Sequence, residues 1–163
     1  MKRSPIRRCV TALLAVCMNV AQACPDSIDA VMAELNALRA QGGVCGARGA
    51  FPAAGPVQWN TTLEAMARQH ARFLVGVGEL RHRNEAGQAL AERATAAGYR
   101  FRRIGENLAQ GQPTLTSVLH AWTVSDTHCT TQLGAAYTDV ALACEPGKNG
   151  RPLWVMVLAR PQP

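Results

Sequence analysis

The chain has 163 residues, 48% of them hydrophobic and 17% charged, and a formal net charge of +6 at pH 7. Four of its 17 lysine and arginine residues and none of its 11 acidic residues lie in residues 1–23, which leaves 13 basic residues against 11 acidic ones. The charge excess belongs mostly to that first segment, so it does not predict a nucleic-acid partner. We expect a local group of arginines to lie on solvated faces of a strand and loops: Arg81, Arg83, Arg93, Arg100, Arg102 and Arg103.

The first 23 residues have the three parts of a secretory signal peptide. The segment begins with four basic residues, continues with an apolar run over residues 9–20 and ends with the small residues of a cleavage site at 21–23. No apolar run in the chain reaches the ~20 residues that span a bilayer. We therefore expect a mature chain of residues 24–163 that is secreted or periplasmic and has no transmembrane span. A lipid anchor on Cys24 is an alternative, because this cysteine would follow the cleavage site.

Residues 24–163 suffice for one compact domain and are too few for two. Apolar residues at helical spacing predict helices over residues 27–40, 61–77, 88–97 and 113–122. The second helix is expected to open with a capping box at Thr61-Thr62-Leu63-Glu64. Residues 99–104 are expected to be extended and to lead into a turn at Gly105-Glu106-Asn107. Apolar segments at 137–144 and 153–159, joined by a Gly- and Pro-containing turn, predict an antiparallel hairpin. The implied fold is α+β, a three-layer α-β-α sandwich with a mainly antiparallel central sheet.

Four of the six cysteines remain after residue 23. An even number in an exported chain favours two disulfides, with three possible connectivities. We expect Cys24–Cys45 and Cys129–Cys144, because each pair closes a short loop of sequence. The first pair must bring together the two ends of a helix about 21 Å long. No C-x-x-C spacing indicates a zinc site made of cysteines.

Three ordered motifs give the chain its resemblance to a known family. His82 is followed by Gly105-Glu106-Asn107-Leu108 and then by the tryptophan, serine and histidine of residues 122–128. Together with Ala97-Gly98-Tyr99 and the terminal hairpin, this order resembles the CAP superfamily of cysteine-rich secretory, antigen 5 and pathogenesis-related 1 proteins. The resemblance covers nearly all of residues 24–163, as a small bacterial CAP (SCP-like) domain, and implies lipid or cell-envelope molecules as ligands.

The resemblance also implies a polar cleft at His82, Glu106, Ser125 and His128. Two histidines and one carboxylate could hold zinc or another divalent cation. Eukaryotic members often have a second glutamate at the position of Ser125, and serine cannot supply that charge. We therefore expect no required cofactor, and at most a weakly held cation at His82, Glu106 and His128. The alternative is structural, with Glu106 accepting hydrogen bonds from His128 and from backbone N–H groups.

We therefore expect a secreted binding module more than an enzyme. One alternative is a metal-dependent or serine-type hydrolase, for which Ser125, His128 and Glu106 could be written as a triad, although no G-x-S-x-G elbow surrounds the serine. The other alternative is a structural extracellular interaction protein. We expect His70 to be a hydrogen-bonded core histidine and His120 to face outward.

Overall fold

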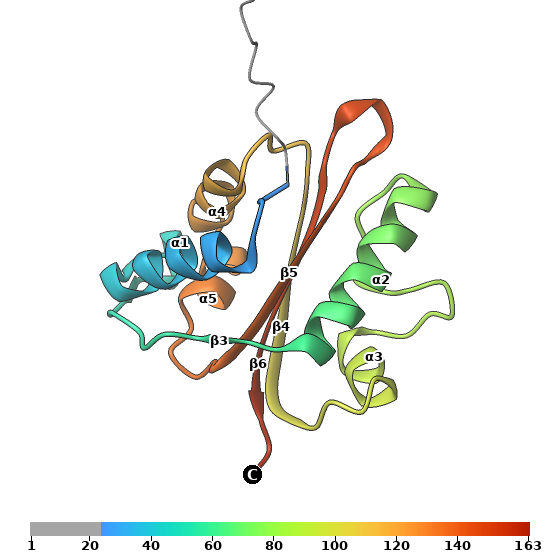
Figure 1. The fold of residues 1–163 in the computed structure, drawn as a ribbon. Helices are drawn as coiled ribbons and strands as arrows, with labels where there is room; N and C mark the ends of the chain where they lie inside the picture. The colour runs from blue at the N-terminus through green and yellow to red at the C-terminus, as the bar shows by residue number, and fades with distance from the viewer. Residues whose placement is uncertain (1–23) are drawn as a thin grey trace, which may run out of the picture.

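A computed structural model describes residues 24–163, and the signal peptide predicted over residues 1–23 lies outside the described residues. The elements follow in the order α1 (Ile28–Gln41), β1 (Gly43–Val44), η1 (Gly46–Arg48), β2 (Ala50–Phe51), β3 (Gln58–Trp59), α2 (Thr61–Val77), α3 (Leu90–Ala96), β4 (Phe101–Gln110), α4 (Leu115–Thr123), α5 (Asp126–Leu133), β5 (Asp139–Glu145), η2 (Lys148–Gly150) and β6 (Leu153–Pro161). Helices α1, α4 and α5 lie on one side of the sheet, and α2 and α3 lie on the other (Figure 1). The predicted three-layer sandwich is confirmed. Within residues 24–163, no helix is both long and apolar enough to cross a membrane.

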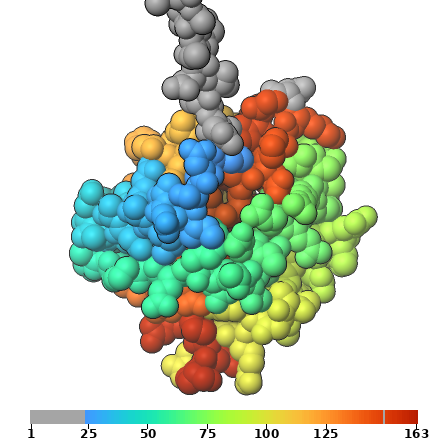
Figure 2. Space-filling view, viewed as in Figure 1, coloured from blue at the N-terminus to red at the C-terminus, as the bar shows by residue number. Residues whose placement is uncertain are grey.

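The main sheet has the strand order β3-β5-β6-β4. The β5–β6 and β6–β4 pairs are antiparallel, and only the short β3 runs parallel to β5. The sheet is therefore mainly antiparallel, as predicted, and β4 is one of its edges. Figure 2 shows the same view with side chains, in which the segment between α1 and α2 crosses the front of the molecule.

Strand β6 is buried on both of its faces. Trp154, Met156 and Leu158 belong to the core cluster under α1 and α4, whereas Val155 and Val157 belong to the cluster under α2. This alternation follows from the two-residue period of a strand. The hairpin sequence is nearly continuously apolar because the sheet is covered on both sides.

Two local predictions are wrong. The turn expected at Gly105-Glu106-Asn107 lies inside β4, where Glu106 pairs with Val157 of β6. A Cβ atom on Gly105 would lie 2.7 Å from the hydroxyl oxygen of Tyr137, so this glycine permits close packing and marks no turn. The capping box at residues 61–64 is also absent, since the side chain of Asn60 accepts from the backbone N–H groups of Thr62 and Leu63.

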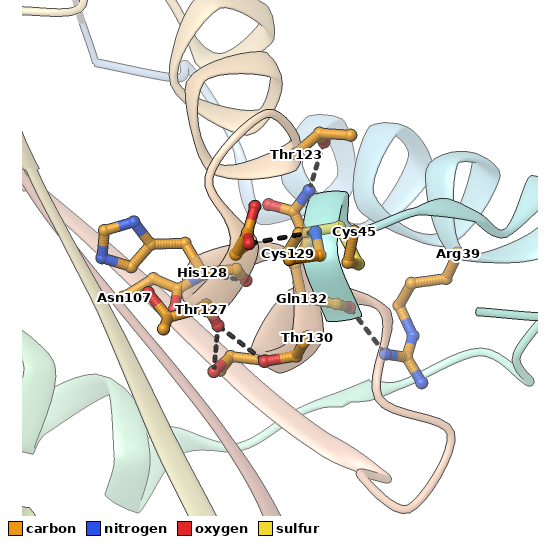
Figure 3. Close-up of a disulfide and its surroundings, with 12 residues drawn as sticks. Arg39, Cys45, Asn107, Thr123, Thr127, His128, Cys129, Thr130 and Gln132 are labelled. Atoms are coloured by element: carbon orange, nitrogen blue, oxygen red, sulfur yellow. Dashed lines mark hydrogen bonds between the residues drawn. A yellow bond between two sulfur atoms is a disulfide. The ribbon is translucent and has the colours of Figure 1, made fainter. Parts of the chain in front are cut away.

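The predicted disulfide pairing is wrong as well. The structure links Cys24 to Cys144 and Cys45 to Cys129, each with a Cα–Cα distance of 5.4 Å. Helix α1 has 14 residues and holds Cys24 and Cys45 apart at its two ends, so each cysteine meets a different part of the fold. Figure 3 shows the second bridge, which fastens the segment after α1 to α5. The sulfur of Cys24 is used in the first bridge, and a thioether-linked lipid would need that same atom.

Candidate functional site

Glu106 occupies the middle of the edge strand β4, on the face that α2 and α3 cover. Its neighbour Asn107 points to the opposite face, where its Nδ2 donates to the carbonyl oxygen of His128 at 2.9 Å (Figure 3). Successive side chains of a strand point to opposite faces, so Glu106 and the helix that carries His128 are separated by the sheet. This geometry explains why the expected bond between Glu106 and His128 is not made.

Arg93 of α3 is the principal partner of Glu106. Its Nη2 atom lies 2.6 Å from Oε2 of Glu106, and the two side chains are only 5% and 1% exposed. The same nitrogen lies 3.4 Å from the carbonyl oxygen of His82. The prediction that Arg93 lies on a solvated face is therefore wrong, and sequence reasoning missed the main counterion of the site.

His82 is the exposed member of the cluster. Its Nδ1 atom lies 2.8 Å from Oε1 of Glu106, and its side chain is 59% exposed. Because a carboxylate can only accept, this contact places a proton on Nδ1. The remaining nitrogen, Nε2, is then the ring atom that can contact a ligand. The predicted association of His82 with Glu106 is thus present in the structure.

His70 of α2 lies beneath this pair. Its Nε2 atom is 3.0 Å from the carbonyl oxygen of Arg81 and 4.0 Å from Oε1 of Glu106. Burial lowers the pKa of His70 below its usual range, while the Glu106 carboxylate acts in the opposite direction. His70 is a buried, hydrogen-bonded histidine, as expected, and it also belongs to the Glu106 cluster, which was not expected.

Within residues 24–163, the side chains of His128 and Ser125 make no hydrogen bond to Glu106, whose oxygens bond to His82 and Arg93. Burial lowers the pKa of His128, and the nearby His82 lowers it further. Ser125 stands at the N-cap of α5, where its side chain makes no capping hydrogen bond. The arrangement of Ser125, His128 and Glu106 that a serine hydrolase would need is therefore not formed.

The cluster does not fit a divalent cation. Across residues 24–163, no group of three or more histidine, cysteine or acidic side chains is placed to hold a metal ion. The guanidinium of Arg93 already neutralises the carboxylate of Glu106 and would repel a second positive charge there. Of the expected ligands, His82 and Glu106 are in contact, whereas His128 is near His82 and makes no hydrogen bond to Glu106, whose two oxygens bond to His82 and Arg93.

A cavity of about 600 Å³ adjoins the cluster. It lies between α2, α3 and the segment that connects them, and its lining includes His70 and Arg93. A second cavity, of about 390 Å³, lies beside the bridge between Cys24 and Cys144. Neither cavity is lined by His82, Glu106 or His128.

Comparisons with known proteins agree with the motifs. The model of the cysteine-rich secretory protein family, CAP, matches residues 32–158. No curated protein matches the chain at a significant level. An outer surface protein from Borrelia burgdorferi superposes with a TM-score of 0.69 at 18% identity, over 82% of this chain and 92% of that one.

Two further solved structures share the fold. An extracellular protein from Bacillus anthracis with an SCP domain has a TM-score of 0.62 at 15% identity, over 81% of this chain and 41% of that one. The structure of NaASP2 with Zn²⁺ has a TM-score of 0.53 at 13% identity, over 85% of this chain and 88% of that one. At these identities the likeness shows the fold alone.

Proposed function

Because the chain belongs to the cysteine-rich secretory protein family, we propose that it is a secreted or periplasmic protein that binds a lipid or another cell-envelope molecule through the surface around His82. The two disulfides fit an oxidising compartment. Two structural neighbours, an outer surface protein and an extracellular protein, support the same location.

The observation that carries this proposal is an exposed imidazole fixed by a buried carboxylate. One oxygen of Glu106 accepts a hydrogen bond from Arg93, and the other accepts from Nδ1 of His82. A polar group that is already fixed loses little conformational freedom when a ligand binds, so more of the contact energy appears as affinity. His82 is therefore a suitable hydrogen-bonding contact for a hydroxyl, carbonyl or phosphate of an envelope molecule.

The proposal does not require a cation. NaASP2 has a structure with Zn²⁺. In this chain the sheet lies between Glu106 and the helix that carries His128, and Arg93 forms an ion pair with the Glu106 carboxylate. One observation favours the hydrolase alternative, since a carboxylate also orients the histidine of a catalytic triad. A nucleophile against His82 would be needed in addition, and in residues 24–163 the one hydrogen-bond partner of its ring is Glu106.

Retention of lipid by histidine variants tests the proposal. The purified mature protein would be freed of lipid, incubated with a total lipid extract of a bacterial envelope, and recovered for mass spectrometry. Loss of one ligand hydrogen bond should reduce retention by His82→Ala about tenfold. The matched control is His120→Ala, because His120 is exposed on α4 and should retain as much lipid as the wild type. Equal retention by the two variants, or none by the wild type, would contradict the proposal.

A further inference from the structure

Four exposed arginines lie at the end of the sheet where β4 begins and β6 ends. They are Arg100, Arg102, Arg103 and Arg160, and we call them the arginine tip. The two strands are paired at this end, with Arg103 opposite Arg160 and Phe101 opposite Pro161. The segments that carry the tip project together from the molecule, in yellow and red at the bottom of Figure 2. The tip is therefore a compact group on the outer surface.

Arg103 and Arg160 are direct neighbours across the two strands. Leu158 of β6 belongs to the core cluster under α1 and α4, so Arg160, two residues further along, points to the same side of the sheet. Arg103 is its cross-strand partner and shares that side. Burial raises the pKa of Tyr137 and Arg103 acts in the opposite direction, which agrees with a guanidinium close to that ring. Like charges directly opposite each other in an antiparallel pair are destabilising.

No acidic side chain offsets this repulsion. Among residues 24–163, none of the four arginines of the tip forms an ion pair, whereas Arg68 and Arg72 each pair with a glutamate. Asp139 begins β5 at the same end of the sheet, but its Oδ2 atom already accepts from Asn60 and Tyr99. The tip is a local excess of positive charge on a mature chain with 13 basic and 11 acidic residues.

Protection of the sheet edge does not explain the tip. Charged side chains on an edge strand prevent it from pairing with another chain, and this role suits Arg102 and Arg103 of β4. Arg160, however, belongs to β6, which lies between β5 and β4, and Arg100 precedes β4. Proteins keep such locally unfavourable arrangements mainly at functional sites. The opposed pair therefore indicates a partner that neutralises it.

The side chains of the tip are suited to phosphate groups. A guanidinium binds phosphate oxygens through two parallel hydrogen bonds. An anionic membrane presents many phosphates in one plane, and each arginine close to it raises the affinity about fivefold. Proteins that bind single-stranded nucleic acid also use aromatic side chains on which bases stack. The aromatic residue within the tip, Phe101, packs instead against the core cluster under α2. These features favour a membrane over a nucleic acid.

We propose that the arginine tip docks the protein on an anionic membrane surface, with its guanidinium groups in contact with lipid phosphates. The phosphates supply the negative charge that the opposed pair of Arg103 and Arg160 lacks within the protein. The docking surface does not include His82, and the inference does not rest on a ligand at that residue.

Co-sedimentation with lipid vesicles tests this inference. The mature protein would be mixed with vesicles of phosphatidylglycerol and phosphatidylcholine, and separately with vesicles of phosphatidylcholine alone. It should bind the anionic vesicles and not the neutral ones. Binding should weaken at least about tenfold between about 0.1 M and about 1 M salt, because the Debye length falls from about 10 Å to about 3 Å. The double variant Arg103→Gln, Arg160→Gln should bind about 25-fold more weakly, at about fivefold for each charge removed.

The double variant Arg48→Gln, Arg151→Gln is the matched control. Both of its arginines are exposed and lie outside the tip, and it loses the same net charge, so it should bind the anionic vesicles nearly as the wild type does. The tip variant should melt no lower than the wild type, because it removes a repulsion; a lower midpoint would contradict the opposed pair.

Three results would overturn the docking surface. Equal binding of anionic vesicles by the two double variants would show that the tip has no special role. Neutral vesicles bound as tightly as anionic ones would exclude recognition by charge. A DNA duplex bound more tightly than the anionic vesicles, with the binding lost in the tip variant, would assign the tip to nucleic acid instead.

Discussion

Removal of Arg93 should destabilise the protein more than removal of any exposed arginine. In Arg93→Met, the carboxylate of Glu106 stays buried beneath α3 and loses a contact of 2.6 Å. Breaking a buried pair from one side typically costs about 3–5 kcal/mol, because the other charge remains without compensation. This loss is a large fraction of the roughly 5–15 kcal/mol by which a domain is stable.

Urea unfolding at pH 7.5 with intact disulfides measures this loss. Arg102→Met is the control, since Arg102 is exposed and such substitutions usually change stability by less than about 0.5 kcal/mol. The double variant Arg93→Met, Glu106→Met should be more stable than Arg93→Met, because it removes the uncompensated charge. A loss below about 1 kcal/mol in Arg93→Met, or a double variant as unstable as the sum of the two single changes, would refute this reasoning.

Three other results are expected. Peptide mapping without reduction should find Cys45 linked to Cys129, and a peptide joining Cys24 to Cys45 would contradict this pairing. Replacing both Cys45 and Cys129 with alanine should lower the free energy of unfolding by about 2–5 kcal/mol. Glu106→Ala should lower the thermal midpoint more than Ser125→Ala, since each donor left unpaired costs roughly 1–3 kcal/mol, and equal midpoints would show that Glu106 contributes little. Burial lowers the pKa of His70 in the folded state. The stability that the neutral imidazole contributes is therefore complete above the pKa of about 6.5 that His70 has in the unfolded chain. As the pH falls below that value, this stability is lost at up to about 1.4 kcal/mol per pH unit. His70→Gln should flatten this dependence between pH 7.5 and 5.5, and an unchanged slope would count against a buried neutral imidazole.

The architecture could be predicted because its signals are local. The helical spacing of apolar residues such as Val31 and Leu35 located α1, and the apolar segments on either side of a turn located the β5–β6 hairpin. The disulfides could not be predicted in this way, since a pairing such as Cys45 with Cys129 depends on how α1 and α5 meet in space. Short loops of sequence are a poor guide when a helix separates their ends.

The site was predicted only in part, because it also depends on how separate elements meet in space. The motifs identified His82 and Glu106 correctly as neighbours. They could not show that residue 106 lies in a strand. This position makes Glu106 face α2, while the next residue, Asn107, faces α5 and bonds to the backbone of His128. Arg93 was missed because α3 has only seven residues, too few for a periodic pattern that would distinguish its buried side from its exposed side.

The tautomer of His82 tests the central claim most directly. Nitrogen chemical shifts of the histidine rings, measured by NMR above pH 7.5, report which nitrogen carries the proton. If Glu106 holds Nδ1 as the 2.8 Å contact indicates, the proton of neutral His82 lies on Nδ1, and Glu106→Gln removes this preference while His120 is unchanged. A proton on Nε2 in the wild type, or the same shifts for His82 in both proteins, would contradict the account of a buried carboxylate that orients an exposed imidazole.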